Sequence, residues 1–326
     1  MKILVTGATG FLGSHVAERL VRDGHQVRAL VRRTSRTDFL ESLGVELVLA
    51  SLETGEGLDR AVDGVDAIVH GAGVVKARSP EEFLRVNAEG TRRLLDAAER
   101  GAGNLRRFLY VSSLAAAGFT DSGRPKTEED PPTPLTHYGK SKLEGERAVL
   151  ERADRLPVTA IRPPAIYGPR DTEMYAFFQM VARRVVAYLG SPDNKLSLIY
   201  APDCADAIVT ALQHEHPSGR VYFVEDGRQY TQAEFARLVG QALGVRPVPL
   251  KVPLGVVKLA AVGSELYGRA TGRAVMLTRD KLKELVHPNL TCSSERIQRE
   301  LGWQPKVQLE EGARHTVAWY RAQGML

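Results

Sequence analysis

The chain has 326 residues, of which 43% are hydrophobic and 25% are charged, and its formal net charge is +5 at neutral pH. This composition is ordinary for a globular protein with a sizeable core, and no run of five like charges indicates a nucleic-acid-binding tail. The first residues do not form a signal peptide, and no apolar run approaches the ~20 residues that a membrane-spanning helix needs. The two cysteines, Cys204 and Cys292, have neither metal-ligand nor redox spacing. We therefore expect a cytoplasmic protein with no bound metal, no membrane span and no nucleic-acid partner.

The first thirteen residues, MKILVTGATGFLG, predict a strand, a glycine-rich turn and the start of a helix. Residues 3–5 form an apolar run of strand length, and apolar residues at helical spacing follow from Ser14. Between them stand Gly7, Gly10 and Gly13, which would allow a tight turn, close approach of a phosphate and tight helix packing. A turn between a strand and a helix N-terminus is suited to bind a pyrophosphate. The residues that we expect to contact it are Gly7, Thr9, Gly10, Phe11 and Leu12.

Strands and helices alternate regularly through the first half of the chain. Gly24 ends the first helix, Pro80 opens another, and residues 138–151 form a further helical stretch. The predicted strands cover residues 3–5, 27–31, 45–49, 67–69, 108–111 and 158–161. This alternation predicts an α/β fold with a doubly wound parallel sheet, the Rossmann architecture.

The pattern changes after Arg162, where several prolines interrupt the chain. Beyond this point the predicted helices cover residues 174–189, 232–243 and 256–266, and a short strand is predicted over 221–224. We expect a dinucleotide-binding domain over residues 1–165 and a smaller mixed α/β substrate domain over residues 166–326. Part of residues 195–226 is expected to return to the first domain.

Tyr138 and Lys142 stand four residues apart at the start of a predicted helix, which places both side chains on one face. A phenol has a pKa of about 10 in water, and an ammonium about 4–5 Å away would lower that pKa toward neutrality. Ser113 comes directly after a predicted strand, and ligands bind at the carboxyl edge of open α/β sheets. These three residues are therefore candidates for the reacting centre.

Several motifs occur here in the order found in one known family: TGATGFLG, Asn87 within RVNAEGT, Ser113, Tyr138-x-x-x-Lys142, and Arg162-Pro163. Over residues 1–210 the chain resembles the extended short-chain dehydrogenase/reductase family, also called the NAD-dependent epimerase/dehydratase family. A further likeness lies in ELGWQP, residues 300–305.

The resemblance implies an NAD(P)-dependent enzyme with a defined set of roles. Tyr138 would be the general acid or base, Lys142 would lower the pKa of Tyr138 and hold the nicotinamide ribose, and Ser113 would polarise the substrate oxygen. Asn87 would support the geometry of the catalytic site. The resemblance also implies a homodimer formed through the helices near residues 81–99 and 138–151.

The end of the second predicted strand indicates which dinucleotide is preferred. NAD-binding members place an acidic residue there for the ribose 2′-hydroxyl, whereas this chain has Arg32 and Arg33 and no carboxylate before Asp38. Arginine suits the 2′-phosphate through charge-assisted bonds, so we expect NADP(H) rather than NAD(H), with Arg32 as the main contact. The resemblance implies further cofactor contacts at Ser51, Leu52, Gly71, Ala72, Gly73, Ser112, Tyr138, Lys142, Pro163 and Ala165.

The same fold serves several reactions, so particular residues must decide between them. A dehydratase of this family carries an acid/base pair directly after the serine, where this chain has Leu114-Ala115-Ala116. Sugar-nucleotide epimerases carry an asparagine at the position of Ala165. The segments LIYAPDCADAI and RPPAIYGP look more like the 3β-hydroxysteroid dehydrogenase and dihydroflavonol-reductase-like members.

We therefore expect an NADP(H)-dependent oxidoreductase that transfers hydride between nicotinamide and a ketone or secondary alcohol on a largely apolar small molecule. Residues 174–181 and 254–276 are candidates for lining the substrate pocket, although both stretches could instead be core between the domains. The alternative is a nucleotide-sugar epimerase that uses the same serine, tyrosine and lysine. A third interpretation is a non-catalytic dinucleotide-sensing module, and the intact trio argues against it.

Overall fold

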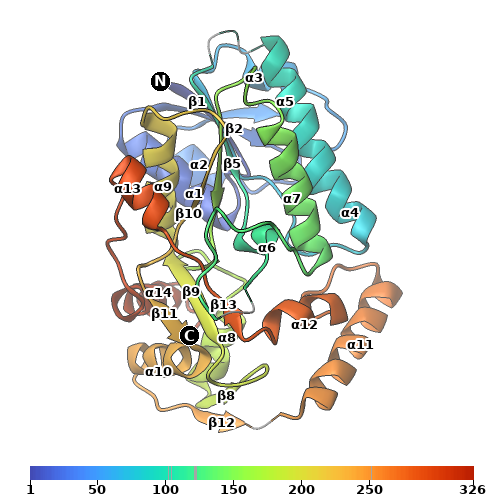
Figure 1. Ribbon diagram of the computed structural model, residues 1–326, viewed down its shortest axis with the longest axis vertical. Helices are drawn as coiled ribbons and strands as arrows, with labels where there is room; N and C mark the ends of the chain where they lie inside the picture. The colour runs from blue at the N-terminus through green and yellow to red at the C-terminus, as the bar shows by residue number, and fades with distance from the viewer. Residues whose placement is uncertain (102, 104, 121–122, 251) are drawn as a thin grey trace.

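The computed structural model describes residues 1–101, 103, 105–120, 123–250 and 252–326 of the chain. Seven parallel strands form its main sheet (Figure 1). In spatial order they are β10 (Arg220–Phe223), β6 (Val158–Arg162), β5 (Arg107–Val111), β4 (Ala67–His70), β1 (Lys2–Thr6), β2 (Gln26–Val31) and β3 (Glu46–Leu49). From β1 the chain runs to one edge through β2 and β3, and β4, β5 and β6 then extend the other edge. The doubly wound parallel sheet is therefore confirmed, and its strand order reverses between β1 and β4, where open α/β sheets bind ligands.

The burial of strand β1 on both faces explains why its sequence is continuously apolar. Ile3, Leu4 and Val5 are at most 1% exposed because helices cover both faces of the sheet. Ile3 and Val5 belong to one hydrophobic cluster, and Leu4 belongs to the cluster on the opposite face. The helices that contribute to the first cluster are α1 (Phe11–Arg22), α2 (Asp38–Ser42), α9 (Ala201–Gln213) and α13 (Glu295–Leu301). Those of the second are α3 (Leu58–Val62), α5 (Gly90–Gly101) and α7 (His137–Leu150).

The helix that Pro80 opens is not regular. Helix α4 (Pro80–Leu84) passes into a π-helical turn, η1 (Arg85–Glu89), before α5 begins. This turn places Asn87 inside the protein, where its side chain is 1% exposed. π-Helical turns of this kind are frequent at functional sites.

The second half of the chain forms smaller sheets with helices around them. The four-stranded sheet contains β7 (Ala165–Tyr167), β9 (Lys195–Tyr200), β11 (Gln229–Thr231) and β13 (Asn289–Leu290), and a separate pair contains β8 (Val185–Ala187) and β12 (Val248–Leu250). The helices packed around the larger sheet are α8 (Tyr175–Ala182), α10 (Gln232–Leu243) and α14 (Leu309–Ala322). The expected smaller mixed α/β part is thus present.

Two helix predictions in this half have different outcomes. The helix predicted over 232–243 is confirmed as α10, and a capping box between Thr231 and Glu234 fixes its start. The helix predicted over 174–189 is wrong beyond Ala182. Arg184 has a left-handed backbone with φ of 61°, and the chain then enters β8, which pairs with β12.

The remaining helices are α6 (Leu114–Ala117), α11 (Leu254–Thr271) and α12 (Arg279–Leu285). Helix α11 is longer than the predicted 256–266 and projects beside the body of the molecule, and α12 leads from it toward α7 (Figure 1). Strand β10 lies in the main sheet beside β6, although it follows β9 of the smaller sheet. None of the helices in the described residues is long and apolar enough to span a bilayer.

Candidate functional site

The glycine-rich turn after β1 is closed by main-chain contacts. Gly7 has φ of +75°, and a Cβ atom there would lie 2.8 Å from the main-chain nitrogen of Ala72. A Cβ on Gly13 would lie 2.1 Å from the oxygen of Gly7, so α1 could not approach the turn with any larger residue. The nitrogen of Gly10 donates to the oxygen of Gly7 at 2.9 Å. The turn therefore holds the N-terminus of α1 open to solvent, as a phosphate site requires.

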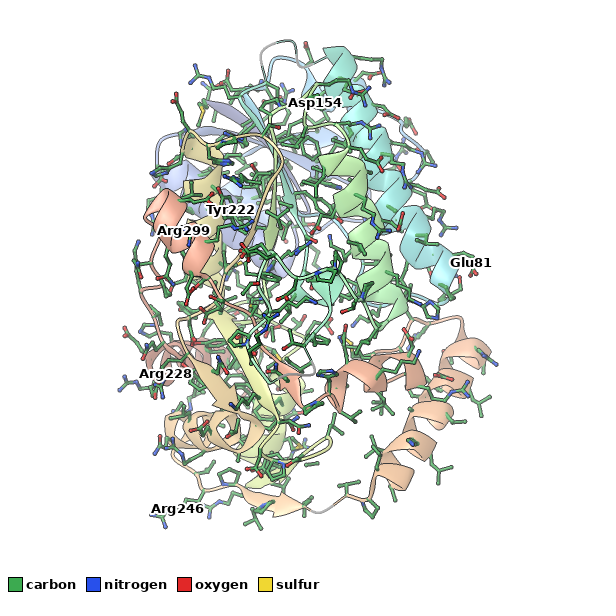
Figure 2. The ribbon with its side chains drawn as sticks, viewed as in Figure 1. Glu81, Asp154, Tyr222, Arg228, Arg246 and Arg299 are labelled. Carbon is green, nitrogen blue, oxygen red and sulfur yellow. The ribbon has the colours of Figure 1, made fainter. Side chains whose placement is uncertain are left out.

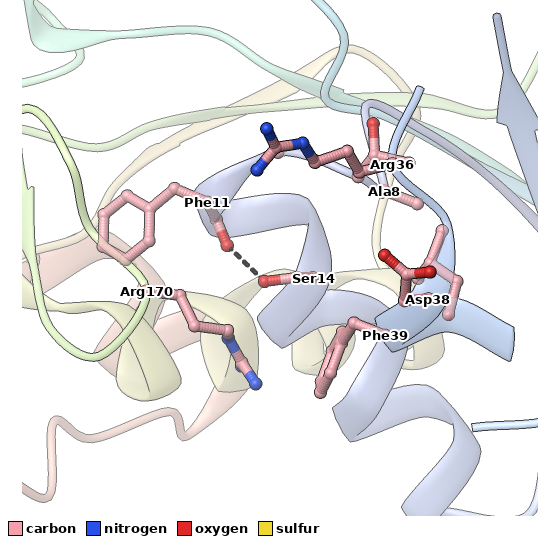
Figure 3. A pocket seen from close by; sticks show the side chains of 10 residues that line it. Ala8, Phe11, Ser14, Arg36, Asp38, Phe39 and Arg170 are labelled. Atoms are coloured by element: carbon pink, nitrogen blue, oxygen red, sulfur yellow. Dashed lines mark hydrogen bonds between the residues drawn. The ribbon is translucent and has the colours of Figure 1, made fainter. Parts of the chain in front are cut away.

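A pocket of about 280 Å³ lies in front of this turn (Figure 3). Thr9, Gly10 and Phe11 line it together with Arg36 and Arg170. This shape and charge fit the pyrophosphate and ribose end of a dinucleotide, because main-chain donors and cations face one space. Leu12 is the second residue of α1 and is partly buried.

The arginines after β2 divide into structural and exposed ones. Arg28 is buried and donates to Glu46 and to three main-chain oxygens around α3, so its role is structural. Arg32 and Arg33 are exposed, and the Arg32 nitrogen bonds the Ser35 hydroxyl at 3.0 Å in a tight turn.

Arg36 lines the pocket, and sequence reasoning did not select it. The carboxylate of Asp38 lines the same pocket (Figure 3). The only sequence signal for Arg36 was its place on the loop after β2. Arg170 was also missed, because it comes from the loop after β7, far along the chain. Its guanidinium bonds Glu18 at 2.7 Å and stacks 4.5 Å from the ring centre of Phe39.

The remaining predicted cofactor contacts follow several strands of the main sheet. Ser51 and Leu52 follow β3 and are partly buried, and the Ser51 hydroxyl accepts from the nitrogen of Thr54 at 3.2 Å. Ser112 is buried at the end of β5, and its hydroxyl has no hydrogen-bond partner among the described residues. Pro163 is buried and accepts from the nitrogen of Leu114 at 2.8 Å, whereas Ala165 is exposed in β7. An unsatisfied buried hydroxyl beside an open edge is what a bound polar ligand would satisfy.

Asn87 ties the loop after β4 to helix α7. Its side-chain oxygen accepts from the nitrogen of Val74 at 2.8 Å, and its amide donates to the Val74 oxygen at 3.0 Å. The same amide donates to the Ser141 hydroxyl at 2.9 Å, and Ser141 donates to the main-chain oxygen of Tyr138 at 2.8 Å. A Cβ on Gly73 would lie 2.9 Å from the Asn87 side-chain oxygen, so this loop needs its glycine. Asn87 thus fixes the loop containing exposed Gly71 and Gly73 and partly buried Ala72.

His70 continues the hydrogen bonds of Asn87 across the sheet. The Thr91 hydroxyl donates to the Asn87 main-chain oxygen at 2.8 Å, so its oxygen is left to accept from His70 Nε2 at 2.9 Å. His70 Nδ1 then accepts from the Thr6 hydroxyl at 2.6 Å, and Thr6 accepts from the nitrogen of Ala72 at 3.1 Å. Burial and the nearby Lys142 lower the pKa of His70 to about 3, so its ring is neutral. Sequence reasoning did not identify this chain of hydrogen bonds.

Ser113, Tyr138 and Lys142 meet where β5 ends and α7 begins. Ser113 is the N-cap of α6, where its oxygen accepts from the nitrogen of Ala115 at 3.1 Å. Thr136 caps α7 by accepting from the nitrogen of Gly139 at 3.1 Å, and the first turn of that helix carries Tyr138. One turn later, Nζ of Lys142 donates to the main-chain oxygen of Val111 at 2.7 Å.

The pKa of Tyr138 differs from the sequence-based expectation. Burial raises it to about 12, a hydrogen bond with Ser113 acts in the opposite direction, and the charge of Glu284 raises it further. Lys142 is not among the groups that shift this pKa, and its ammonium lies over the ring of Tyr110, 4.2 Å from the ring centre. Burial also lowers the pKa of Lys142 itself to about 7. In this geometry Tyr138 is a protonated acid at neutral pH.

Helix α12 covers the start of α7, which the sequence did not indicate. The Thr136 hydroxyl donates to buried Glu284 at 3.1 Å, and the carboxylate of Asp280 accepts from the nitrogen of His137 at 2.7 Å. Lys281 is paired with Glu284, and its Nζ lies 5.9 Å from the ring centre of Tyr138. The residues of α12 therefore belong to the surroundings of the candidate acid.

A second cavity, of about 620 Å³, opens beside His137. One wall comes from residues 77–83 and the other from α11 and α12. Part of the predicted stretch 254–276 therefore lines a cavity beside His137, the residue before Tyr138. Residues 174–181 do not line it, because Phe178 and Val181 are buried in the core with α10 and α14.

Sequence comparison identifies the family of this chain. The sequence model of the NAD dependent epimerase/dehydratase family matches residues 3–224. The chain belongs to this family. It is an NAD(P)-dependent enzyme of the extended short-chain dehydrogenase/reductase type, as the turn, the site and the sheet had indicated.

Three relatives show the range of reactions in the family. A ceramide reductase of Caulobacter vibrioides is 37% identical over 325 residues, which cover 99% of this chain and 96% of that protein. A 4-hydroxy-2-methyl-3-oxo-4-farnesyl-3,4-dihydroquinoline-1-oxide ketoreductase of Stigmatella aurantiaca is 27% identical, covering 96% and 94%. A UDP-glucose 4-epimerase of Vibrio cholerae is 27% identical, also covering 96% and 94%.

Proposed function

We propose that this chain is an NADP(H)-dependent reductase of a ketone on a largely apolar small molecule, a reaction that runs in reverse as oxidation of a secondary alcohol. The observation that carries the proposal is the meeting of Ser113, Tyr138 and Lys142 at the carboxyl end of β5, beside the turn that closes on Gly7. Two relatives with reductase names act on molecules whose names include long hydrocarbon parts, ceramide and a farnesyl quinoline. We extend this to a substrate with a long hydrocarbon chain.

The chain's own residues supply the proton and the orientation. The nicotinamide, when bound, supplies the hydride to the carbonyl carbon. Ser113 donates a hydrogen bond to the carbonyl oxygen, because its own oxygen already accepts from Ala115. Tyr138 gives its proton to that oxygen as the C–H bond forms, and solvent restores the proton afterward. A tyrosine with a pKa of about 12 is protonated at neutral pH, which suits the acid role in reduction.

The remaining parts of the proposal concern the cofactor and the assembly. Arg32, Arg33 and Arg36 supply cations after β2 that would favour the 2′-phosphate of NADP(H). Lys142 would hold the nicotinamide ribose. We further propose a cytoplasmic homodimer formed through α5 and α7, and sedimentation with variants on those helices tests it.

The alternative function is a nucleotide-sugar epimerase. The relative from Vibrio cholerae favours it, and the missing asparagine at Ala165 counts against it. The deciding experiment follows the absorbance of NADPH while the protein meets long-chain ketones, steroid ketones and flavanonols. A parallel panel of UDP-, GDP- and dTDP-sugars is examined by product analysis, since epimerisation leaves no net absorbance change. Turnover of a ketone that disappears in Tyr138→Phe supports the reductase, and a changed sugar with no ketone turnover replaces it by the epimerase.

A further inference from the structure

Helix α11 presents apolar side chains to solvent. Twelve large hydrophobic side chains of the described residues are exposed, and eight of these lie within residues 248–276. On α11, Leu259 is 73% exposed and Leu266 is 58% exposed. They are seven residues apart, which places both on the same side of the helix.

The same helix uses its opposite side to pack. Val257, Ala261 and Gly268 are its buried residues. Val257 and Ala261 form a small cluster with Leu282 of α12, and Leu189 after β8 packs against it. A helix on the surface of a globular protein normally turns its apolar side inward and its polar side outward. Here the outward side is apolar as well, so it requires a partner that covers it.

We define the α11 surface as Val248, Leu250, Val256, Leu259, Leu266 and Tyr267. Basic residues border it: among the described residues from 246 to 276 these are Arg246, Lys258, Arg269 and Arg273, and the one carboxylate is Glu265. Glu265 is already paired with Arg279 at 2.9 Å, which leaves the border positively charged. Figure 2 shows Arg246 at the end of the molecule that carries β12 and the start of α11.

We propose that the α11 surface docks on a bilayer containing anionic phospholipids. Exposed apolar side chains beside lysine and arginine are the features by which a helix lies in a membrane interface, with the cations near the lipid phosphates. A second copy of the chain fits less well, because a symmetric contact would bring the same basic border against itself. The helix does not span the bilayer in this arrangement but lies along its surface.

The position of α11 relates the proposed membrane contact to the candidate functional site. Gly268 and Arg269 of the same helix, with Gly272 directly after it, line the cavity beside His137, and Phe83 on the other wall contacts the ring of Tyr138. One helix therefore borders both the proposed membrane contact and a cavity close to Tyr138. A lipid ketone could pass from the bilayer into the cavity without crossing bulk water. This last step rests on the proposed function, whereas the docking itself does not.

The test is sedimentation of the full chain with vesicles of phosphatidylcholine alone and of phosphatidylcholine mixed with phosphatidylglycerol. We expect binding to the mixed vesicles that weakens as salt is added. Leu259→Gln with Leu266→Gln should weaken binding about tenfold or more, and Lys258→Gln about fivefold on the anionic vesicles. The control is Leu49→Gln, which changes an exposed leucine at the far edge of the main sheet and should bind as the unaltered chain does.

Several outcomes would overturn the proposal. One is equal sedimentation of the double variant and the control, and another is no binding to either vesicle. A third is a dimer of the unaltered chain in solution that becomes a monomer in the double variant, because the α11 surface would then contact a second copy.

A paired assay separates docking from the proposed function. Turnover of a short soluble ketone should be the same in the unaltered chain and in the double variant. Turnover of a long-chain ketone held in vesicles should be lower in the double variant. Vesicle binding without turnover of any ketone would support docking and reject the reductase.

Discussion

Nζ of Lys142 donates to the main-chain oxygen of Val111 at 2.7 Å, and this bond joins helix α7 to the end of strand β5. The ammonium is held in a buried place, and burial lowers its pKa to about 7. Family resemblance suggested a lysine that acts on the tyrosine beside it. The structure instead gives a lysine that is anchored to the strand and available at the edge where the cofactor would bind.

Burial of the Lys142 ammonium predicts that this side chain costs stability. The folded protein takes up the lysine proton below about pH 7, whereas an unfolded lysine keeps its proton to a pKa near 10.5. The cost is therefore full below pH 7 and shrinks as the pH rises from 7 toward 10.5. Lys142→Met should raise the free energy of unfolding at pH 6 by on the order of 3 kcal/mol, with a smaller gain at pH 10. Denaturant unfolding at the two pH values measures this, and an equal gain at both would contradict it.

The phenol of Tyr138 is predicted to be the proton donor. Tyr138→Phe should lower kcat for ketone reduction by about 10²–10⁴-fold, because removing a general acid has an effect of this size. The circular dichroism spectrum should not change, since the Tyr138 hydroxyl bonds the Ser113 side chain and not the main chain of a helix. Tyr188→Phe is the matched control, and it should keep full activity. A Tyr138→Phe protein with more than a tenth of the original kcat would remove Tyr138 from the acid role.

The hydrogen bonds around His70 predict a loss of both stability and activity on substitution. His70→Phe keeps a ring in the core but leaves the hydroxyls of Thr6 and Thr91 without their partner, at a cost of about 2–4 kcal/mol. Because the folded pKa is about 3 and the ordinary value is 6.5, the contribution of His70 to stability is present above pH 6.5 and declines as the pH falls toward 3. The variant should lack this part of the acid sensitivity.

Thr91→Val separates the positioning role of His70 from its packing. It keeps the shape of Thr91 and removes only the hydroxyl that joins His70 to the Asn87 main chain. We expect a lower kcat with a nearly unchanged KM, because the loop and the first turn of α7 would be less well fixed. A fall in stability with unaltered kcat would show that the hydrogen bonds support the fold alone.

The parts of the molecule that the sequence predicted are those set by local pattern. Strand β1 is buried on both faces and therefore reads as a continuous apolar run, and α10 has its cap and its apolar spacing within a few residues. The bond between Thr6 and His70 joins residues 64 positions apart, and Glu284 meets Thr136 across 148 positions. Such contacts depend on how the whole chain packs, and so no local pattern could indicate them. The start of β8 was missed for the same reason, because its partner β12 comes far later in the chain.

The glycines of the turn are predicted to have separable roles. Gly13→Ala should prevent the approach of α1 to the turn, since its Cβ would lie 2.1 Å from the Gly7 oxygen, and the protein should unfold readily or not accumulate. Gly10→Ala is milder, because its Cβ would lie 3.2 Å from the same oxygen. That variant should fold and bind NADPH more weakly. Thermal unfolding with and without NADPH distinguishes them, and a Gly13→Ala protein as stable as the original would disprove this packing account.

The arginines after β2 predict the choice of cofactor. Arg32→Asp should remove the preference for NADPH over NADH, because a carboxylate repels the 2′-phosphate and accepts from a ribose hydroxyl.

Arg36 and Asp38 face the same pocket, so they offer a matched pair of tests. Arg36→Gln should weaken NADPH about five- to tenfold and leave NADH nearly unchanged, as the loss of one charge-assisted bond predicts. Asp38→Asn should strengthen the binding of NADPH, because it removes a negative charge from the pocket. Titration of each variant with both dinucleotides measures these affinities. Unchanged affinities in Arg32→Asp, with a clear loss of NADPH affinity in Arg36→Gln, would assign the phosphate contact to Arg36. The structure allows this outcome, because Arg36 lines the pocket in front of the glycine turn whereas Arg32 lies exposed in the turn that it makes with Ser35.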